Sequence, residues 1–220
     1  MNPAPPVTTA FTGAGDGSVG AVPGLFVTIE GIDRSGKSTQ ARRLVEALGE
    51  EALLVREPGG TPAGERIREL LKDPAVALGA RTEALLFAAA RAELVETVIR
   101  PALEAGRTVV SDRFLDSSLA YQGHARELGE DEVRRINDWA TSGLRPDLTV
   151  LLEIDPAEAA ARAGVTDRFE DEGLDLQRRV AEAYDRMAAA DPGRWKRIDA
   201  ARSEDAVHAD IVNLLERAPA

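Results

Sequence analysis

Short apolar runs alternate along the chain with longer stretches in which apolar residues recur at helical spacing. We predict buried strands at residues 25–30, 52–55, 108–112, 148–154 and 194–198. The helical spacing predicts helices at residues 37–48, 61–72, 81–104, 131–142, 157–163 and 174–190, and a last helix that Ser203 caps. Pro101 is expected to bend or restart the longest of them. Strands that alternate with helices indicate βαβ units, and therefore an α/β fold with a parallel sheet.

The first 23 residues differ from the rest of the chain. They are mostly Gly, Pro, Ser, Thr and Ala, with Asp16 as their one charged residue, which predicts a flexible tail. They lack the basic and continuous apolar regions of a signal peptide. We expect residues 24–220 to form a single domain, because 220 residues with 44% apolar content can bury one large core.

Charge and cysteine content narrow the classes of function. The formal net charge of −11 disfavours a general nucleic-acid binder, although a local basic cleft could still hold phosphates. The chain has no cysteine, which excludes a disulfide scaffold, a thiolate metal site and a cysteine nucleophile. No apolar run approaches the roughly 20 residues of a membrane helix. We therefore predict a cytoplasmic protein with no membrane and no nucleic-acid partner.

A phosphate-binding motif follows the first predicted strand. Residues 31–38 read Gly-Ile-Asp-Arg-Ser-Gly-Lys-Ser and match G-x-x-x-x-G-K-[ST], in the strand-to-helix context that the motif requires. Backbone N–H groups of such a loop surround phosphate oxygens, Lys37 reaches the β- and γ-phosphates, and the Ser38 hydroxyl binds Mg²⁺. Arg34 could stabilise the oxygens of the transferring phosphoryl group. The loop alone leaves a kinase, a GTPase switch, an ATPase motor and an amide-forming synthetase open.

A second group of side chains is suited to an aromatic monophosphate. Arg56, Arg68 and Arg113 lie at or beside strand ends, and arginine forks match phosphate oxygens. Phe87 and Arg91 are four residues apart on one helix, so an aromatic ring and a donor share a face.

Gln122 belongs to the same group, because its amide carries both a donor and an acceptor and suits the imide edge of a pyrimidine.

Several longer stretches resemble the thymidylate kinases of the P-loop nucleoside monophosphate kinase group, and the combination of motifs resembles that of the bacterial members. The matching stretches are residues 26–40, Arg-Glu-Pro-Gly-Gly-Thr at 56–61, residues 82–91, Asp-Arg-Phe-Leu-Asp-Ser-Ser-Leu-Ala-Tyr-Gln-Gly at 112–123, residues 144–148 and residues 167–170. The resemblance extends from about Leu25 to the C-terminus. The second and fourth of these stretches are far more specific than the phosphate loop.

The resemblance implies a three-layer fold with a five-stranded parallel sheet in the order 2-3-1-4-5 and a short lid. It implies a kinase that transfers the γ-phosphoryl group of ATP to dTMP, giving dTDP for dTTP synthesis, with Mg²⁺ and as a homodimer. Because the second pKa of a phosphate monoester is about 6, the acceptor is already nucleophilic at pH 7 and needs no general base.

The resemblance also implies roles for individual residues. For ATP it implies Gly31, Ile32, Asp33, Arg34, Ser35, Gly36, Lys37, Ser38, Thr39 and Arg162. For dTMP it implies Asp33, Arg56, Arg68, Phe87, Arg91, Arg113, Ser118, Tyr121 and Gln122. Within this set, Phe87 stacks on thymine, Arg91 donates to O4, and Tyr121 and Asp33 lie near the sugar. Ser38 and Asp112 are implied at the metal, and the implied catalytic residues are Lys37, Arg34, Arg113 and Arg168.

The lid, at about residues 162–173, departs from the family pattern because it is short and carries only two arginines. Arg162 is expected over the adenine and Arg168 at the phosphates, while ion pairs with Glu170 or Asp171 are the alternative for both. The phosphate-loop Arg34 could compensate for the short lid.

Three other functions stay open from the sequence. The first is a related kinase that acts on another deoxynucleotide or nucleoside. The second is a nucleotide-binding switch that no longer transfers phosphate, against which the intact Lys37, Ser38, Arg34 and Arg113 argue. The third is a nucleic-acid-processing ATPase, which the net charge disfavours.

Overall fold

A single five-stranded sheet forms the centre of the computed structural model, which describes residues 24–162 and 173–216. The strands are β1 (Phe26–Glu30), β2 (Ala52–Arg56), β3 (Thr108–Asp112), β4 (Leu148–Glu153) and β5 (Trp195–Asp199). They pair in parallel in the order β2-β3-β1-β4-β5. The predicted α/β class and strand order are confirmed.

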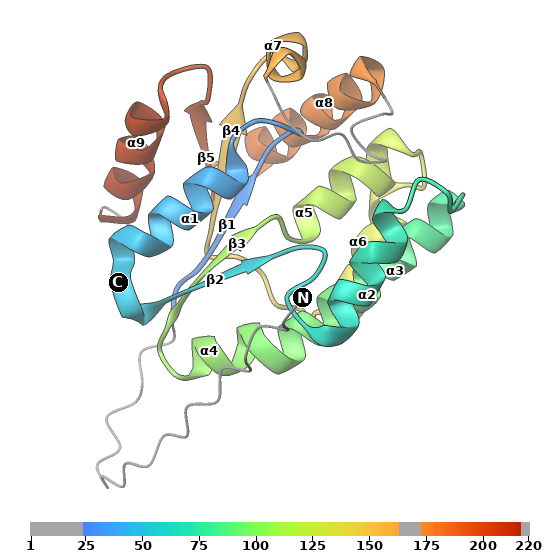
Figure 1. Cartoon of the computed structure of the whole chain (residues 1–220), viewed down its shortest axis with the longest axis horizontal. Helices are drawn as coiled ribbons and strands as arrows, with labels where there is room; N and C mark the ends of the chain where they lie inside the picture. The colour runs from blue at the N-terminus through green and yellow to red at the C-terminus, as the bar shows by residue number, and fades with distance from the viewer. Residues whose placement is uncertain (1–23, 163–172, 217–220) are drawn as a thin grey trace, which may run out of the picture.

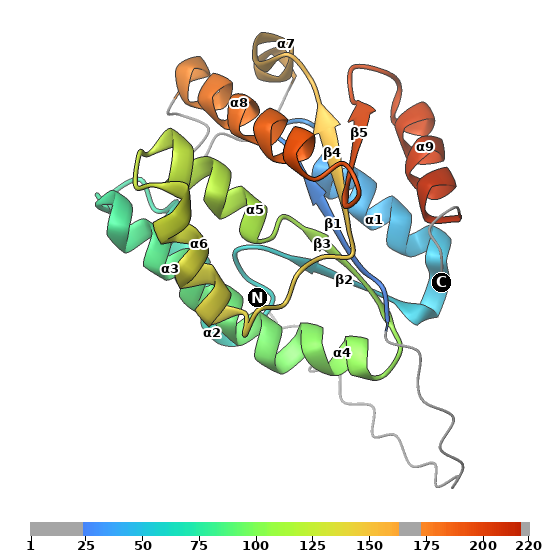
Figure 2. The ribbon, with the colours of Figure 1, turned by 180° about the vertical axis from the view of Figure 1, so that it is seen from behind.

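Helices cover both faces of this sheet, which gives the predicted three layers (Figure 1). Helices α1 (Lys37–Leu48) and α9 (Glu204–Glu216) lie on one face, and α8 (Leu174–Ala190) lies on the other (Figure 2). The remaining α-helices are α2 (Pro62–Lys72), α3 (Ala80–Leu94), α4 (Arg100–Glu104), α5 (Leu115–Ser118), α6 (Glu130–Ala140) and α7 (Pro156–Ala161). Three short helical segments complete the list: η1 (Gly49–Glu51), η2 (Val95–Ile99) and η3 (Leu119–Ala125).

The central strand β1 is buried on both faces. Val27 and Ile29 pack into a cluster with the buried faces of α1 and α9, whereas Phe26 packs into a cluster on the opposite face. A strand between two helix layers favours apolar residues on both of its faces, which is why β1 is mostly apolar; its buried polar residues, Thr28 and Glu30, are hydrogen-bonded within the protein. The layers place the carboxyl end of β1, and the loop that follows it, at the middle of the sheet edge.

Most predicted elements match the structure within one or two residues, but the sequence analysis missed the helical segment formed by α5 and η3. Its residues from Leu115 to Gly123 are all buried. A helix that is buried all round has no polar face, so its sequence shows no amphipathic period.

The predicted bend at Pro101 appears as the π-helical segment η2, just before the proline, after which the helix continues as α4. Proline has no N–H to donate to the preceding turn, so the hydrogen-bond pattern changes there.

Candidate functional site

The phosphate loop joins β1 to α1 with backbone that requires glycine at its start. Gly31 has φ of 145°, and a Cβ there would lie 2.6 Å from the Leu152 carbonyl oxygen. Lys37 begins α1, and its buried side chain folds back so that Nζ donates to the Ile32 carbonyl at 2.6 Å. The ammonium therefore lies under the loop, where the phosphates of a nucleotide would replace a carbonyl as its acceptor.

The Lys37 ammonium is destabilised in this position. Burial lowers its pKa to about 8, and the nearby Arg113 guanidinium acts in the same direction, against the carboxylates of Asp33 and Asp112. A bound polyanion would reverse this shift. The free site therefore has a cation that gains stability when phosphate arrives.

The two predicted metal-binding side chains meet at the start of α1. Ser38 Oγ donates to Asp112 Oδ2 at 2.5 Å, across from the end of β3. Within residues 24–162 and 173–216 no group of three or more His, Cys, Asp or Glu is placed to hold a metal ion. One hydroxyl and one carboxylate fit Mg²⁺, which commonly binds one or two protein oxygens together with substrate phosphates and water.

The side chains of Arg34 and Arg162 each donate a hydrogen bond to the backbone carbonyl of the other residue. Arg34, at φ of 61°, donates from Nη1 to the carbonyls of Ala160 at 3.1 Å and Arg162 at 3.3 Å. Arg162 in turn donates from Nη1 to the Arg34 carbonyl and from Nη2 to the Ala200 carbonyl, at 3.4 and 2.6 Å. The phosphate loop is thereby fixed to the end of α7 and to the loop after β5.

Two pockets meet at the phosphate loop. A cleft of about 700 Å³ extends from the loop toward α2, α3 and η3, and a second pocket of about 520 Å³ extends toward α9. Arg34, Lys37 and Ser38 line both. Ligands in the two pockets would therefore come together at these three side chains.

The larger cleft is lined by more basic than acidic residues, although the chain as a whole is acidic. Its lining contains seven Lys or Arg residues and only four Asp or Glu residues, in a protein of net charge −11. Concentrated positive charge in a concave site favours polyanionic ligands.

Arg113 connects the phosphate loop to the cleft. It has φ of 71°, and its guanidinium donates to the Gly31 carbonyl at 3.2 Å and forms an ion pair with Asp33. Its Cζ lies 5.1 Å from the centre of the Tyr121 ring. Left-handed backbone is uncommon for residues other than glycine, and here both such arginines, Arg34 and Arg113, lie at the site.

Asp33 is held from the opposite side by Gln177 on α8. Gln177 Oε1 accepts from the Asp33 N–H at 3.0 Å, and Gln177 Nε2 donates to Asp33 Oδ2 at 2.7 Å. Burial acts to raise the pKa of Asp33, but the charges of Arg113 and Lys37 outweigh it and hold that pKa below its usual value. Asp33 is therefore an ionised, fixed acceptor at the cleft wall.

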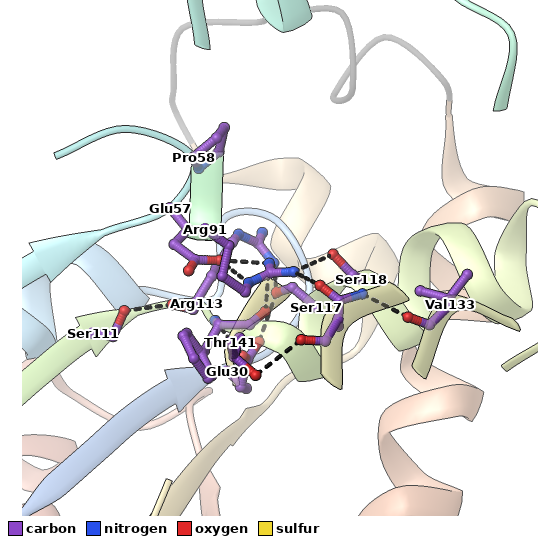
Figure 3. Close-up of polar contacts among 12 residues, drawn as sticks. Glu30, Glu57, Pro58, Arg91, Ser111, Arg113, Ser117, Ser118, Val133 and Thr141 are labelled. Atoms are coloured by element: carbon purple, nitrogen blue, oxygen red, sulfur yellow. Dashed lines mark hydrogen bonds and ion pairs between the residues drawn. The ribbon is translucent and has the colours of Figure 1, made fainter. Parts of the chain in front are cut away.

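Beneath Arg113 lies a buried carboxylate, Glu30, to which the sequence analysis gave no role (Figure 3). Glu30 Oε1 accepts from the Phe114 N–H, and Oε2 accepts from the hydroxyls of Ser117 and Tyr184, each at 2.7 Å. Burial first, and then the carboxylate of Asp116, raise the pKa of Glu30 to about 7. Ser117 Oγ also accepts from Arg113 Nη1 at 3.0 Å, so this network supports the guanidinium.

Arg91 does not line the cleft. Its guanidinium is 1% exposed and forms an ion pair with Glu57. It also donates to Ser118 Oγ at 3.0 Å, to the Phe114 carbonyl at 3.1 Å and to Asn137 (Figure 3). Every guanidinium nitrogen thus has a protein acceptor, so the predicted hydrogen bond to a base carbonyl would require Arg91 to exchange one of these partners, and it stays a prediction. Buried charge requires this pairing, which a helical-face argument cannot foresee.

The structure brings most of the other predicted residues together. The cleft is lined by Asp33, Arg34, Lys37, Ser38, Arg56, Arg68, Phe87, Asp112, Arg113, Ser118, Tyr121 and Gln122. The second pocket is lined by Arg34, Ser35, Gly36, Lys37, Ser38, Thr39 and Arg162. Arg168, and the lid apart from its two ends, lie outside the described residues.

Several lining residues were not predicted. Arg42 and Lys72 add charge to the cleft, and Ala200 and Arg202 line the second pocket. Arg42 lies four residues after Ser38 on α1 and could have been found from helical spacing. The others depend on loops and helix ends that only the tertiary fold brings to the site.

The chain is similar in sequence and in structure to known proteins. The family model described as thymidylate kinase matches residues 29–211. The chain is 48% identical over 194 residues to a thymidylate kinase of Deinococcus radiodurans, covering 86% of this chain and 94% of that protein. It is 50% identical over 196 residues to a thymidylate kinase of Bifidobacterium longum, covering 86% and 95%. A solved structure of thymidylate kinase from Ehrlichia chaffeensis superposes with a TM-score of 0.75 at 31% identity, covering 88% of this chain and all of that one.

Replacing Glu30 should change how stability depends on pH. The pKa of Glu30 is about 7 in the folded protein and 4.5 in its ordinary state. The protonated group therefore contributes its full stability to the fold below pH 4.5, and this contribution is lost as the pH rises through 7. Glu30→Gln stays neutral, so its free energy of unfolding relative to the natural protein should rise between pH 4.5 and 7, by at most about 3 kcal/mol. Urea unfolding across this range measures it, with the exposed Glu51→Gln as control. A constant difference across the range would contradict the assignment.

Binding of MgATP should take up a proton at pH 8.5. Lys37 is largely neutral there in the free protein and becomes charged beside phosphate, so affinity should fall as the pH rises above 8. Titration calorimetry in two buffers of different ionisation enthalpy measures the uptake. The variant Lys37→Met should bind more weakly and without this uptake; equal uptake by both proteins would assign the proton to another group.

Proposed function

The chain belongs to the thymidylate kinase family, and from this premise we propose how its residues carry out the reaction that it catalyses, the transfer of the γ-phosphoryl group of ATP to dTMP. The products are ADP and dTDP. The observation that carries the residue assignment is the meeting of two pockets at Arg34, Lys37 and Ser38. Two anionic substrates in these pockets would approach one another at three side chains suited to a transferring phosphoryl group.

We place ATP in the pocket toward α9. The loop from Gly31 to Ser38 would surround its phosphates with backbone N–H groups, and the N-terminus of α1 adds positive potential. Arg162, Ala200 and Arg202 line the far end, where the adenine would lie. Arg168 is proposed at the phosphates on the family resemblance alone.

We place dTMP in the basic cleft. Arg56, Arg68 and Arg113 would bind its phosphate; in the free protein Arg56 pairs with Glu65 at 2.9 Å and Arg68 donates to the Pro58 carbonyl at 2.8 Å. Phe87 and Gln122 would contact the thymine.

Three further residues complete the dTMP site. Asp33 and Tyr121 would lie beside the sugar, and Ser118 would meet the polar edge of the base. We assign Arg91 to holding Ser118 in place, because its nitrogens are all engaged within the protein.

Catalysis then consists of positioning and charge neutralisation. The acceptor phosphate is largely dianionic at pH 7 because its second pKa is about 6, so it attacks without a general base. Lys37, Arg34 and Arg113 would stabilise the charge that spreads over the equatorial oxygens in the transition state. In the structure these three cations lie against the same loop, with Asp33 as the counter-charge.

Ser38 and Asp112 are the residues that would hold Mg²⁺ with the phosphates of ATP. When bound, the ion would neutralise phosphate charge and orient the triphosphate. Its ligand set would be completed by phosphate oxygens and water, which agrees with the single carboxylate present.

The reaction is tested by ADP release from MgATP with dTMP, dUMP, UMP, dCMP, dGMP and AMP as acceptors. We expect dTMP to give the highest kcat/KM. If another acceptor gave the highest kcat/KM, the assignment as a kinase would stand, but the placement of thymine at Phe87 and Gln122 would be overturned. ATP binding without turnover of any acceptor would favour a nucleotide-binding switch.

A homodimer is proposed from two exposed apolar side chains on neighbouring helices. Trp139 on α6 is 86% exposed and Leu85 on α3 is 56% exposed, and α3 packs against α6. A second copy covering them would bury apolar surface. Sedimentation velocity at micromolar concentration should show a dimer that Trp139→Glu dissociates and Trp139→Phe retains; a natural protein that sediments as a monomer would overturn the proposal.

The cytoplasmic location stays a prediction; the described helices include none long and apolar enough to cross a membrane.

A further inference from the structure

Two polar pairs connect α3 to the buried segment formed by α5 and η3. Glu83, Phe87 and Arg91 follow one another at four-residue spacing and so share a face of α3. At one end of this face Arg91 Nη1 donates to Ser118 Oγ at 3.0 Å, and at the other Gln122 Nε2 donates to Glu83 Oε1 at 2.9 Å. Phe87 lies between the two pairs in sequence and lines the cleft together with Ser118 and Gln122.

Glu83 can only accept hydrogen bonds in this setting. Its side chain is 1% exposed and is paired with Arg126, whose Nε and Nη2 donate to the two carboxylate oxygens at 2.7 and 3.0 Å. Both carboxylate oxygens thus accept from Arg126, and Glu83 presents an acceptor to Gln122. Gln122 must therefore turn its NH₂ group toward Glu83, whichever way an amide is drawn.

The amide oxygen of Gln122 is then the end that remains available. Among the described residues no donor to this oxygen is found. The oxygen is nevertheless not one of the fully buried side-chain atoms that lack a partner, so it is not sealed inside the protein. Because Gln122 lines the cleft, its oxygen is an acceptor on the cleft side of the pair.

We propose that Glu83 determines which pyrimidine the enzyme accepts, by holding Gln122 with its amide oxygen toward position N3 of the base. Thymine and uracil carry a hydrogen on N3 and can donate it to this oxygen. Cytosine has an unprotonated N3, which would place two acceptors against each other. Glu83 is a positioning residue that acts through Gln122, and the inference rests on the proposed function because it requires the base of dTMP beside Phe87.

The variant Glu83→Gln tests this role. Glutamine at position 83 can donate as well as accept, so the Gln122 amide is free to turn over. We expect the KM values of dTMP and dUMP to rise together, and the preference for dTMP over dCMP in kcat/KM to fall at least about tenfold, the size expected when a buried hydrogen bond is mispaired. The dTMP to dUMP ratio and the KM of ATP should not change.

These ratios separate positioning from a general loss of structure. A collapsed pocket would weaken dCMP as much as dTMP, which would leave the preference unchanged and overturn the inference. The matched control is Glu96→Gln, the same substitution at an exposed position of the same helical stretch, which should keep every ratio.

A second variant covers the case in which Glu83→Gln does not fold. Arg126 is 20% exposed, and Arg126→Gln would remove the guanidinium that holds both carboxylate oxygens of Glu83, so the partner of Gln122 would no longer be fixed in place. The dTMP preference should again fall; an unchanged preference would overturn the inference.

A measurement on the natural protein needs no variant. dTMP methylated at N3 should bind at least about tenfold more weakly than dTMP, because it has lost the hydrogen. Equal binding would overturn the inference while leaving the kinase in place. A natural protein that does not turn over dTMP would instead overturn the proposed function, and this inference with it.

Discussion

The site is built around one buried carboxylate. Glu30, at the end of the central strand, gathers the Phe114 N–H, the Ser117 hydroxyl and the Tyr184 hydroxyl. Phe114 and Ser117 lie at the start of α5 and Tyr184 lies on α8, so one side chain connects β1 to two segments that are distant from it in the sequence. A charge in such a place is tolerated only when its oxygens are fully hydrogen-bonded. Through Ser117 the same network supports Arg113, and through Arg113 it reaches the phosphate loop.

Paired buried charges extend this principle around the cleft. The pairs are Arg91 with Glu57, Arg113 with Asp33, Arg126 with Glu83, and Arg194 with Asp116. Such pairs contribute little net stability, because desolvation offsets their attraction, but losing one partner is costly. Their effect here is geometric, since each holds a loop or helix end beside the cleft.

Local periodicity predicted the strands and the α/β class, and a motif that carries its own geometry predicted the phosphate loop. The order of the strands in the sheet was implied by the resemblance to the thymidylate kinases and is confirmed. The sequence analysis did not predict α5 and η3, whose burial on all sides removes the amphipathic signal. It placed Arg91 at the base but did not predict the buried ion pair that Arg91 forms with Glu57. The helper residues Gln177, Glu30 and Glu83 were also missed, because each acts through a partner far away in the chain and has no motif of its own.

The lysine of the phosphate loop is hydrogen-bonded to the backbone of the loop itself. Lys37 donates to the Ile32 carbonyl at 2.6 Å, so an incoming anion does not meet a vacant cation but has to displace an internal acceptor. A ligand with several phosphates compensates for that loss through many backbone contacts, whereas a lone small anion does so poorly. Exchange of the Ile32 carbonyl for a phosphate oxygen is therefore part of ligand binding at this loop, and a ligand that makes many contacts offsets its cost best.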